Sequence, residues 1–188
     1  VNKLNRINIK LKSKIKPDLV YSDFICKANQ LDFDKYSDEE LKETISGFYG
    51  KNPHSRAELA AIYGMMKEVI HRLTGLKLYD SQLAASASLM YGKVAELPTG
   101  EGKTLAAIIP ATIHAMQGFH VHVLTFNDYL AERDYNITKS VYEFCGISSG
   151  FVTQEISTPE RRKMYQCDIV YVTVKEVGFD YLKNFLCI

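Results

Sequence analysis

A chain of 188 residues with 46% apolar and 24% charged residues is expected to form one globular domain, and this composition excludes a disordered or low-complexity protein. No window approaches the roughly 20 apolar residues of a membrane span, and the N-terminus lacks the apolar stretch of a secretory signal. The cysteines form no Cys-x-x-Cys pair, so we expect small, buried, free thiols in the reducing cytosol. They are Cys26, Cys145, Cys167 and Cys187.

The chain begins with a basic segment. Residues 1–16 carry six lysine or arginine residues and no acidic residue, so a total charge of +1 leaves −5 for the rest. Apolar residues recur there at near-helical spacing, which predicts an amphipathic arm over residues 1–17, although the alternation at Ile9–Lys12 also fits a strand. The arm would bind an anionic partner such as acidic lipid or nucleic acid, and a solvated charged terminus explains the pattern equally well.

Residues 18–76 are expected to form a helical lead-in. Ser37, followed three residues later by glutamate, gives a capping box and predicts a helix over residues 37–48. Ser55 would cap a longer helix over residues 55–73, in which apolar residues recur every three or four positions and which Gly75 ends.

From residue 77 to residue 188 short apolar runs alternate with helical stretches. This alternation predicts a parallel sheet covered by helices on both faces. The expected strands are Val94–Leu97, His120–Phe126, Gly150–Thr153 and Asp168–Thr173, and the expected helices are Lys103–Gln117, Tyr129–Phe144, Pro159–Tyr165 and Glu176–Leu182.

The stretch Ala95–Thr104 reads Ala-Glu-Leu-Pro-Thr-Gly-Glu-Gly-Lys-Thr and predicts a phosphate-binding loop between a strand and a helix. Gly100 and Gly102 would bring backbone N–H groups close to phosphate oxygens at the positive end of the helix. Lys103 would reach the β- and γ-phosphates, and the Thr104 hydroxyl would ligate Mg²⁺. The strict pattern has a glycine five residues before Gly102, where this chain has leucine, and a glycine-rich turn with a solvated lysine is the alternative.

Four blocks in order resemble the SecA preprotein-translocation ATPases, at the start of their first nucleotide-binding domain. The blocks are Tyr79–Gln82, Ala95–Thr104, Leu124–Asp134 and Asp168–Leu182, within a match that runs from about Ser37 to Leu182. The resemblance implies an α/β fold: a helical lead-in and then a partial RecA-like parallel sheet, as in the superfamily 2 helicase-like P-loop NTPases.

The resemblance also implies the ligands and the site residues. ATP or ADP with Mg²⁺ would bind, with the Gln82 amide contacting the adenine at N6 and N7. Gly100, Glu101, Gly102, Lys103 and Thr104 would hold the phosphates and Mg²⁺, and Lys103 and Thr104 would be the catalytic residues.

A protein of this family would be a cytoplasmic ATPase, peripherally associated with the inner face of the cell membrane. Its expected partners are a SecY-type membrane channel, preprotein substrates and anionic lipid bound through residues 1–16, and the resemblance leaves a homodimer open. Nucleic acid is a disfavoured partner, because Asn127–Tyr129 stand where RNA helicases of the superfamily carry Pro-Thr-Arg-Glu-Leu. Arg133 and Asp134 are interpreted as an ion pair on a helix.

The chain departs from the family at several positions. Pro98 replaces a basic residue, Ala85 and Ser86 replace two glycines, and after Ile169 no two acidic residues are adjacent. Catalytic members need such an acidic pair, so we expect this chain alone to bind nucleotide weakly and not to turn it over. Two alternatives therefore stay open: a non-hydrolysing nucleotide-binding or regulatory module, and a helicase-like ATPase acting on nucleic acid.

Overall fold

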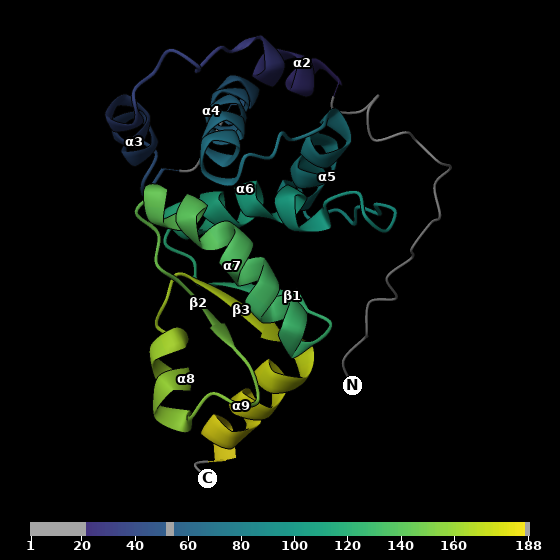
Figure 1. Cartoon of the computed structure of the whole chain (residues 1–188), viewed down its shortest axis with the longest axis vertical. Helices are drawn as coiled ribbons and strands as arrows, with labels where there is room; N and C mark the ends of the chain where they lie inside the picture. The colour runs from purple at the N-terminus through teal and green to yellow at the C-terminus, as the bar shows by residue number, and fades with distance from the viewer. Residues whose placement is uncertain (1–21, 52–54, 187–188) are drawn as a thin grey trace, which may run out of the picture.

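The structure is a computed structural model that describes residues 22–51 and 55–186. The expected basic arm over residues 1–17 and Cys187 lie outside these residues. Within them, helices gather at one end of the molecule and a small sheet with its own helices occupies the other, as Figure 1 shows.

The lead-in consists of helices, as predicted. They are α2 (Ser22–Gln30), α3 (Asp38–Ser46) and α4 (Arg56–Thr74). Helix α5 (Asp80–Met90) follows the predicted lead-in and precedes the phosphate-binding loop. Capping boxes at Ser37 and Ser55 begin α3 and α4, and Gly75 ends α4 with a φ of +71°. The sequence analysis extended α3 two residues beyond its C-terminal end. It did not predict α2 or α5, and α5 has almost no polar face.

The second half alternates helices and strands. Its elements are α6 (Lys103–Met116), β1 (Val121–Thr125), α7 (Asp128–Phe144), β2 (Ser149–Val152), α8 (Thr158–Met164), β3 (Ile169–Thr173) and α9 (Val174–Leu186). The strands are all parallel in the order β1-β3-β2, with Val121 and Ser149 both aligned with Ile169. Each strand lies within about two residues of its predicted range.

Helices cover both faces of this sheet, as the alternation predicted. Ile169 and Tyr171 of β3 point into the large core with α7, which crosses all three strands. Val170 and Val172 point to the opposite face, where they pack with Val177 of α9 and with Met164 of α8. All five residues of β3 are buried, because a central parallel strand is enclosed from both sides.

The prediction of a fourth strand at Val94–Leu97 was wrong. Residues 93–98 have no regular secondary structure, and Val94 is 98% exposed. A strand requires a neighbour for its N–H and C=O groups, and none of the three described strands lies beside this segment. The run of apolar residues alone could not supply that partner.

The large core continues from the lead-in into the sheet. Met66 of α4 is buried against Cys145 at the end of α7, with a distance of 3.8 Å between the sulfur atoms. In the same core the hydroxyl of Tyr142 lies 2.9 Å from that of Tyr171 in β3. The cysteines differ from the expectation of uniform burial, because Cys26 is exposed on α2 and Cys167 is only partly buried.

Candidate nucleotide-binding site

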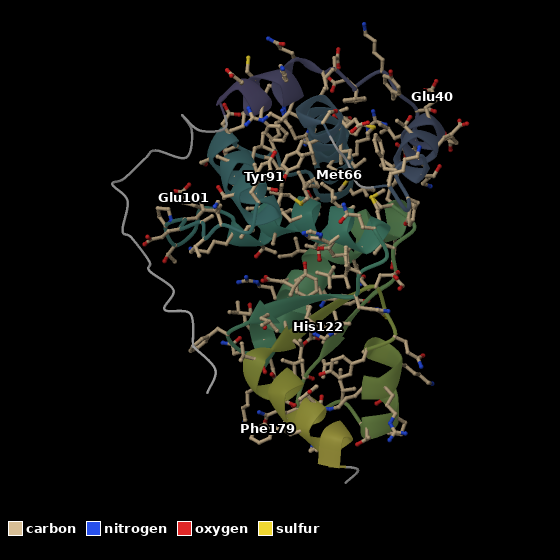
Figure 2. All side chains as sticks on the ribbon, turned by 180° about the vertical axis from the view of Figure 1, so that it is seen from behind. Glu40, Met66, Tyr91, Glu101, His122 and Phe179 are labelled. Carbon is tan, nitrogen blue, oxygen red and sulfur yellow. The ribbon has the colours of Figure 1, made fainter. Side chains whose placement is uncertain are left out.

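The phosphate-binding loop lies between α5 and α6 and projects from the side of the molecule, where Figure 2 labels Glu101. Gly100 has a φ of +89° and Gly102 a φ of +73°. Residues with a Cβ atom rarely adopt such values, so both glycines are used for their backbone freedom. Gly102 directly precedes the first helical residue, Lys103.

The N-terminus of α6 can receive an anion. The first four N–H groups of a helix have no intrahelical acceptor, and the helix dipole adds positive potential there. Among the described helices α6 is the exception with no acidic residue in its first turn. Nothing in that turn therefore opposes a negatively charged ligand.

Lys103 is exposed and folds back over the loop. Its Nζ donates a hydrogen bond to the carbonyl oxygen of Pro98 at 2.8 Å, and the backbone N–H of Glu101 donates to the same oxygen at 3.3 Å. The Pro98 carbonyl thus fixes the ammonium near the loop. A phosphate group would compete for Lys103 as the stronger, charged acceptor.

Thr104 is the second residue of α6 and is half-buried. Its hydroxyl is an oxygen ligand of the kind that Mg²⁺ prefers. Within residues 22–51 and 55–186 no cluster of three or more histidine, cysteine or acidic side chains could hold a metal ion. Mg²⁺ binding by Thr104 stays a prediction.

Gln82 lies beside the loop but is 4% exposed. Its Nε2 donates to the carbonyl oxygen of Glu101 at 2.9 Å, and its Oε1 accepts from the backbone N–H of Tyr79 at 3.0 Å. The structure thus brings Gln82 to the phosphate-binding loop. The contact between Gln82 and adenine stays a prediction.

Tyr79 is an exposed aromatic residue to which the sequence analysis gave no role of its own. Tyr79 precedes α5 and is 70% exposed, although its backbone N–H is bound to Gln82. An exposed aromatic ring can stack on a planar base. The signal was present in the sequence as an aromatic residue three positions before the glutamine.

A groove of about 860 Å³ lies at the carboxyl ends of the three strands. Thr125, Gln154 and Thr173 come from the strand ends, and Asn127 and Asp128 come from the start of α7. The Asn127 side chain caps α7 by accepting from the N–H of Leu130 at 2.9 Å, and Asp128 accepts from the N–H of Gln154 at 2.8 Å. No residue of the phosphate-binding loop lines this groove, so these are two separate features.

The acidic residues after β3 are engaged in ion pairs. Glu176 and Asp180 both contact the guanidinium of Arg161, at 2.7 and 2.8 Å. Asp180 also accepts from the hydroxyl of Tyr165 at 2.9 Å. Burial first of all, and then the hydrogen bond to Asp180, raise the pKa of Tyr165. These ion pairs join α8 to α9.

The expected ion pair of Arg133 and Asp134 is confirmed. The guanidinium contacts the carboxylate at 2.6 Å on the surface of α7. Both residues thereby have a structural role within one helix.

A family model described as the SecA DEAD-like domain matches residues 11–188, which is nearly the whole chain. The chain belongs to the SecA family. The Protein translocase subunit SecA of Elusimicrobium minutum is 42% identical over 178 residues, which are 91% of this chain and 20% of that protein. The Protein translocase subunit SecA of Antithamnion sp. is 39% identical over 173 residues, covering 89% of this chain and 20% of the relative.

A third relative, the Protein translocase subunit SecA of Francisella philomiragia, is 41% identical over 163 residues, which are 18% of that protein. The SecA-family chain described here thus spans about a fifth of the length of these relatives. The helices and the small parallel sheet are consistent with a partial RecA-like fold. None of the described helices is long and apolar enough to cross a membrane.

Proposed function

We propose that this chain is the ATP-binding part of a SecA-type motor that couples ATP hydrolysis to the export of preproteins through a membrane channel. The observation that carries the proposal is the glycine loop at the N-terminus of α6, with Gly100 and Gly102 at positive φ and Lys103 beside them. Membership of the SecA family supports the same function.

Each residue of the loop would make a different contact with ATP or ADP. The N–H groups around Gly100, Glu101 and Gly102 would bind phosphate oxygens, and Lys103 would leave the Pro98 carbonyl to neutralise them. Thr104 would ligate Mg²⁺, which when bound neutralises charge that develops on the phosphates. The exposed Tyr79 ring would stack on the base.

The whole protein would act with partners outside this chain. The relatives are named protein translocase subunits, which supports preproteins as substrates and a SecY-type channel as partner. The basic residues 1–16 would bind anionic lipid and hold a cytoplasmic protein at the inner face of the membrane. A homodimer is compatible with this arrangement.

The test is Lys103→Ala in the complete protein, which we expect to abolish ATPase activity and preprotein export. The substitution removes the positive charge that would neutralise the γ-phosphate. The transition state should therefore lose several kcal/mol of stabilisation. Lys163→Ala, which removes an exposed lysine of α8, is the matched control and should leave both activities unchanged. Retained hydrolysis in the Lys103 variant would overturn the proposal.

One observation favours a second function, a nucleotide-binding module without hydrolysis. Glu176 and Asp180 both pair with Arg161, and they are not adjacent to each other as the expected catalytic acids would be. This alternative predicts that the complete wild-type protein binds ATP but releases no phosphate. A helicase-like function has less support, because the groove at the strand ends is lined by a single cation, Lys175, together with Asp128, whereas nucleic-acid sites gather many cations.

A further inference from the structure

The groove at the carboxyl ends of the strands is lined by large apolar side chains that are open to solvent. Phe126 directly follows β1 and is 92% exposed, and Tyr129 in the first turn of α7 is 70% exposed. Val174, the first residue of α9, lines the same groove and is 63% exposed. Exposed apolar side chains that gather around one groove indicate an interaction surface.

The walls of this groove are fixed to one another by polar contacts. The Asp128 carboxylate accepts from the backbone N–H of Gln154 at 2.8 Å, which joins α7 to the loop after β2. Arg161 donates to the carbonyl oxygen of Thr153 in that loop at 2.7 Å and pairs with Glu176 of α9 at 2.7 Å. The groove is therefore preformed, and a ligand could bind without first ordering its walls.

The rim of the groove is acidic. Glu132 lies one turn along α7 from Asp128, and Glu155 follows Gln154; both glutamates are exposed. With Asp128 they place three carboxylates around the groove, whereas Lys175 is the cation among its described lining residues. This charge pattern repels a nucleic acid or an anionic lipid and favours a ligand that carries positive charge.

The side chain of Gln154 adds a polar group that suits a peptide backbone. It is exposed and lines the groove. A primary amide can both donate to a carbonyl oxygen and accept from an N–H group. The backbone groups of a helix are already paired, whereas those of an extended chain are free to bond. The groove therefore fits an extended chain better than a helix.

We propose that this groove binds an extended polypeptide segment that carries apolar side chains together with lysine or arginine. Phe126 and Tyr129 contact the apolar side chains, Gln154 bonds to a peptide group, and the acidic rim attracts the cations. Apolar contact is not directional, so segments of many sequences can bind. The inference rests on the proposed function for the source of the segment, which is a preprotein during export.

The experiment measures binding of two short, unstructured fluorescent peptides to the complete protein by anisotropy, without nucleotide. One peptide consists of leucine, alanine and lysine, and in the other glutamate replaces lysine. The wild type should bind the lysine peptide more tightly. The double substitution Phe126→Ser and Tyr129→Ser should weaken the lysine peptide by about tenfold, which corresponds to about 1.4 kcal/mol.

Phe119→Ser is the matched control. Phe119 is also an exposed aromatic residue, at 61%, but it precedes β1 and so lies at the opposite end of that strand from Phe126. The control should bind the lysine peptide as the wild type does. Melting temperatures establish that the variants are folded.

Photocross-linking locates the bound peptide without removing an aromatic ring. Benzoylphenylalanine in place of Phe126 should cross-link to the lysine peptide, and the same residue in place of Phe119 should not. Equal cross-linking at both positions, an unchanged affinity of the double variant, or tighter binding of the glutamate peptide would each show that the inference is wrong. Displacement of the lysine peptide from position 126 by a single-stranded oligonucleotide would identify nucleic acid as the ligand and would also overturn it.

The two proposals can fail separately. The peptide measurements contain no nucleotide, so a failure of the groove to bind peptide leaves the ATPase test with Lys103→Ala unaffected. A complete protein that binds the lysine peptide at position 126 but neither hydrolyses ATP nor exports preproteins would instead contradict the proposed function.

Discussion

Burial gives the cysteine side chains different chemical environments. Cys145 is buried against Met66, and burial raises the pKa of its thiol to about 12. Cys26 is exposed on α2. Because the thiolate is the reactive form, Cys145 stays protonated and unreactive over the whole physiological pH range.

Alkylation of the native protein at pH 8 should therefore label Cys26 within minutes and leave Cys145 unmodified, and Cys145 should react only after denaturation. Raising the pH toward 12 raises the thiolate fraction of Cys145, so its labelling rate should increase in that direction. Peptide mass spectrometry assigns the label to each residue, and Cys26→Ser identifies the fast fraction. Equal labelling of both residues in the native protein would contradict the burial of Cys145.

At the scale of elements, Arg161 joins three segments of the chain. Its guanidinium contacts the carboxylates of Glu176 and Asp180 in α9, and it donates to the carbonyl oxygens of Thr153 at 2.7 Å and Ile156 at 3.0 Å. The α8–α9 contact thus depends on one cation between two acids. Because these side chains are mostly buried, their charges lose much of their hydration and need each other.

Arg161→Met should lower the free energy of unfolding by about 3 kcal/mol, since it leaves two buried carboxylates without their partner. Urea unfolding measures this change. Arg162→Met, at the next and exposed position of α8, is the control and should cost less than about 0.5 kcal/mol. Equal effects of the two substitutions would show that the ion pairs contribute nothing to stability.

At the scale of the whole molecule, the lead-in and the sheet share one core. Met66 lies in the middle of the helical end, as Figure 2 shows, and packs against Cys145 of the α/β half. The shared core crosses the boundary expected near residue 76. The two parts should therefore unfold together.

Met66→Ala should destabilise both parts at once, by about 2–5 kcal/mol, because it opens a cavity at their junction. Hydrogen exchange measured by mass spectrometry should show α4 and β3 losing protection together. Leu73→Ala, at a partly exposed position of the same helix, should have a much smaller effect. Loss of protection confined to α4 would mean that residues 18–76 form an independent unit.

Local signals explain which parts of the fold could be predicted. The caps at Ser37 and Ser55 and the left-handed Gly75 depend on residues a few positions apart, so the sequence contains the whole cause. The ranges of β1, β2 and β3 follow equally from their apolar runs. Helix α5 was not predicted from the sequence. It is buried on nearly all sides, so its sequence lacks the periodic alternation of polar and apolar residues that indicates a surface helix.

The candidate site also combines features that the sequence determines with features that depend on the tertiary structure. The sequence by itself determined the family, the phosphate-binding loop and the need for glycine at positions 100 and 102, because these depend on contiguous residues. Only the tertiary structure decided that Val94–Leu97 forms no strand, and that Gln82 bonds to Glu101, nineteen positions away. A strand partner and a hydrogen bond between helices both depend on segments distant in the chain, which the order of residues does not place in contact.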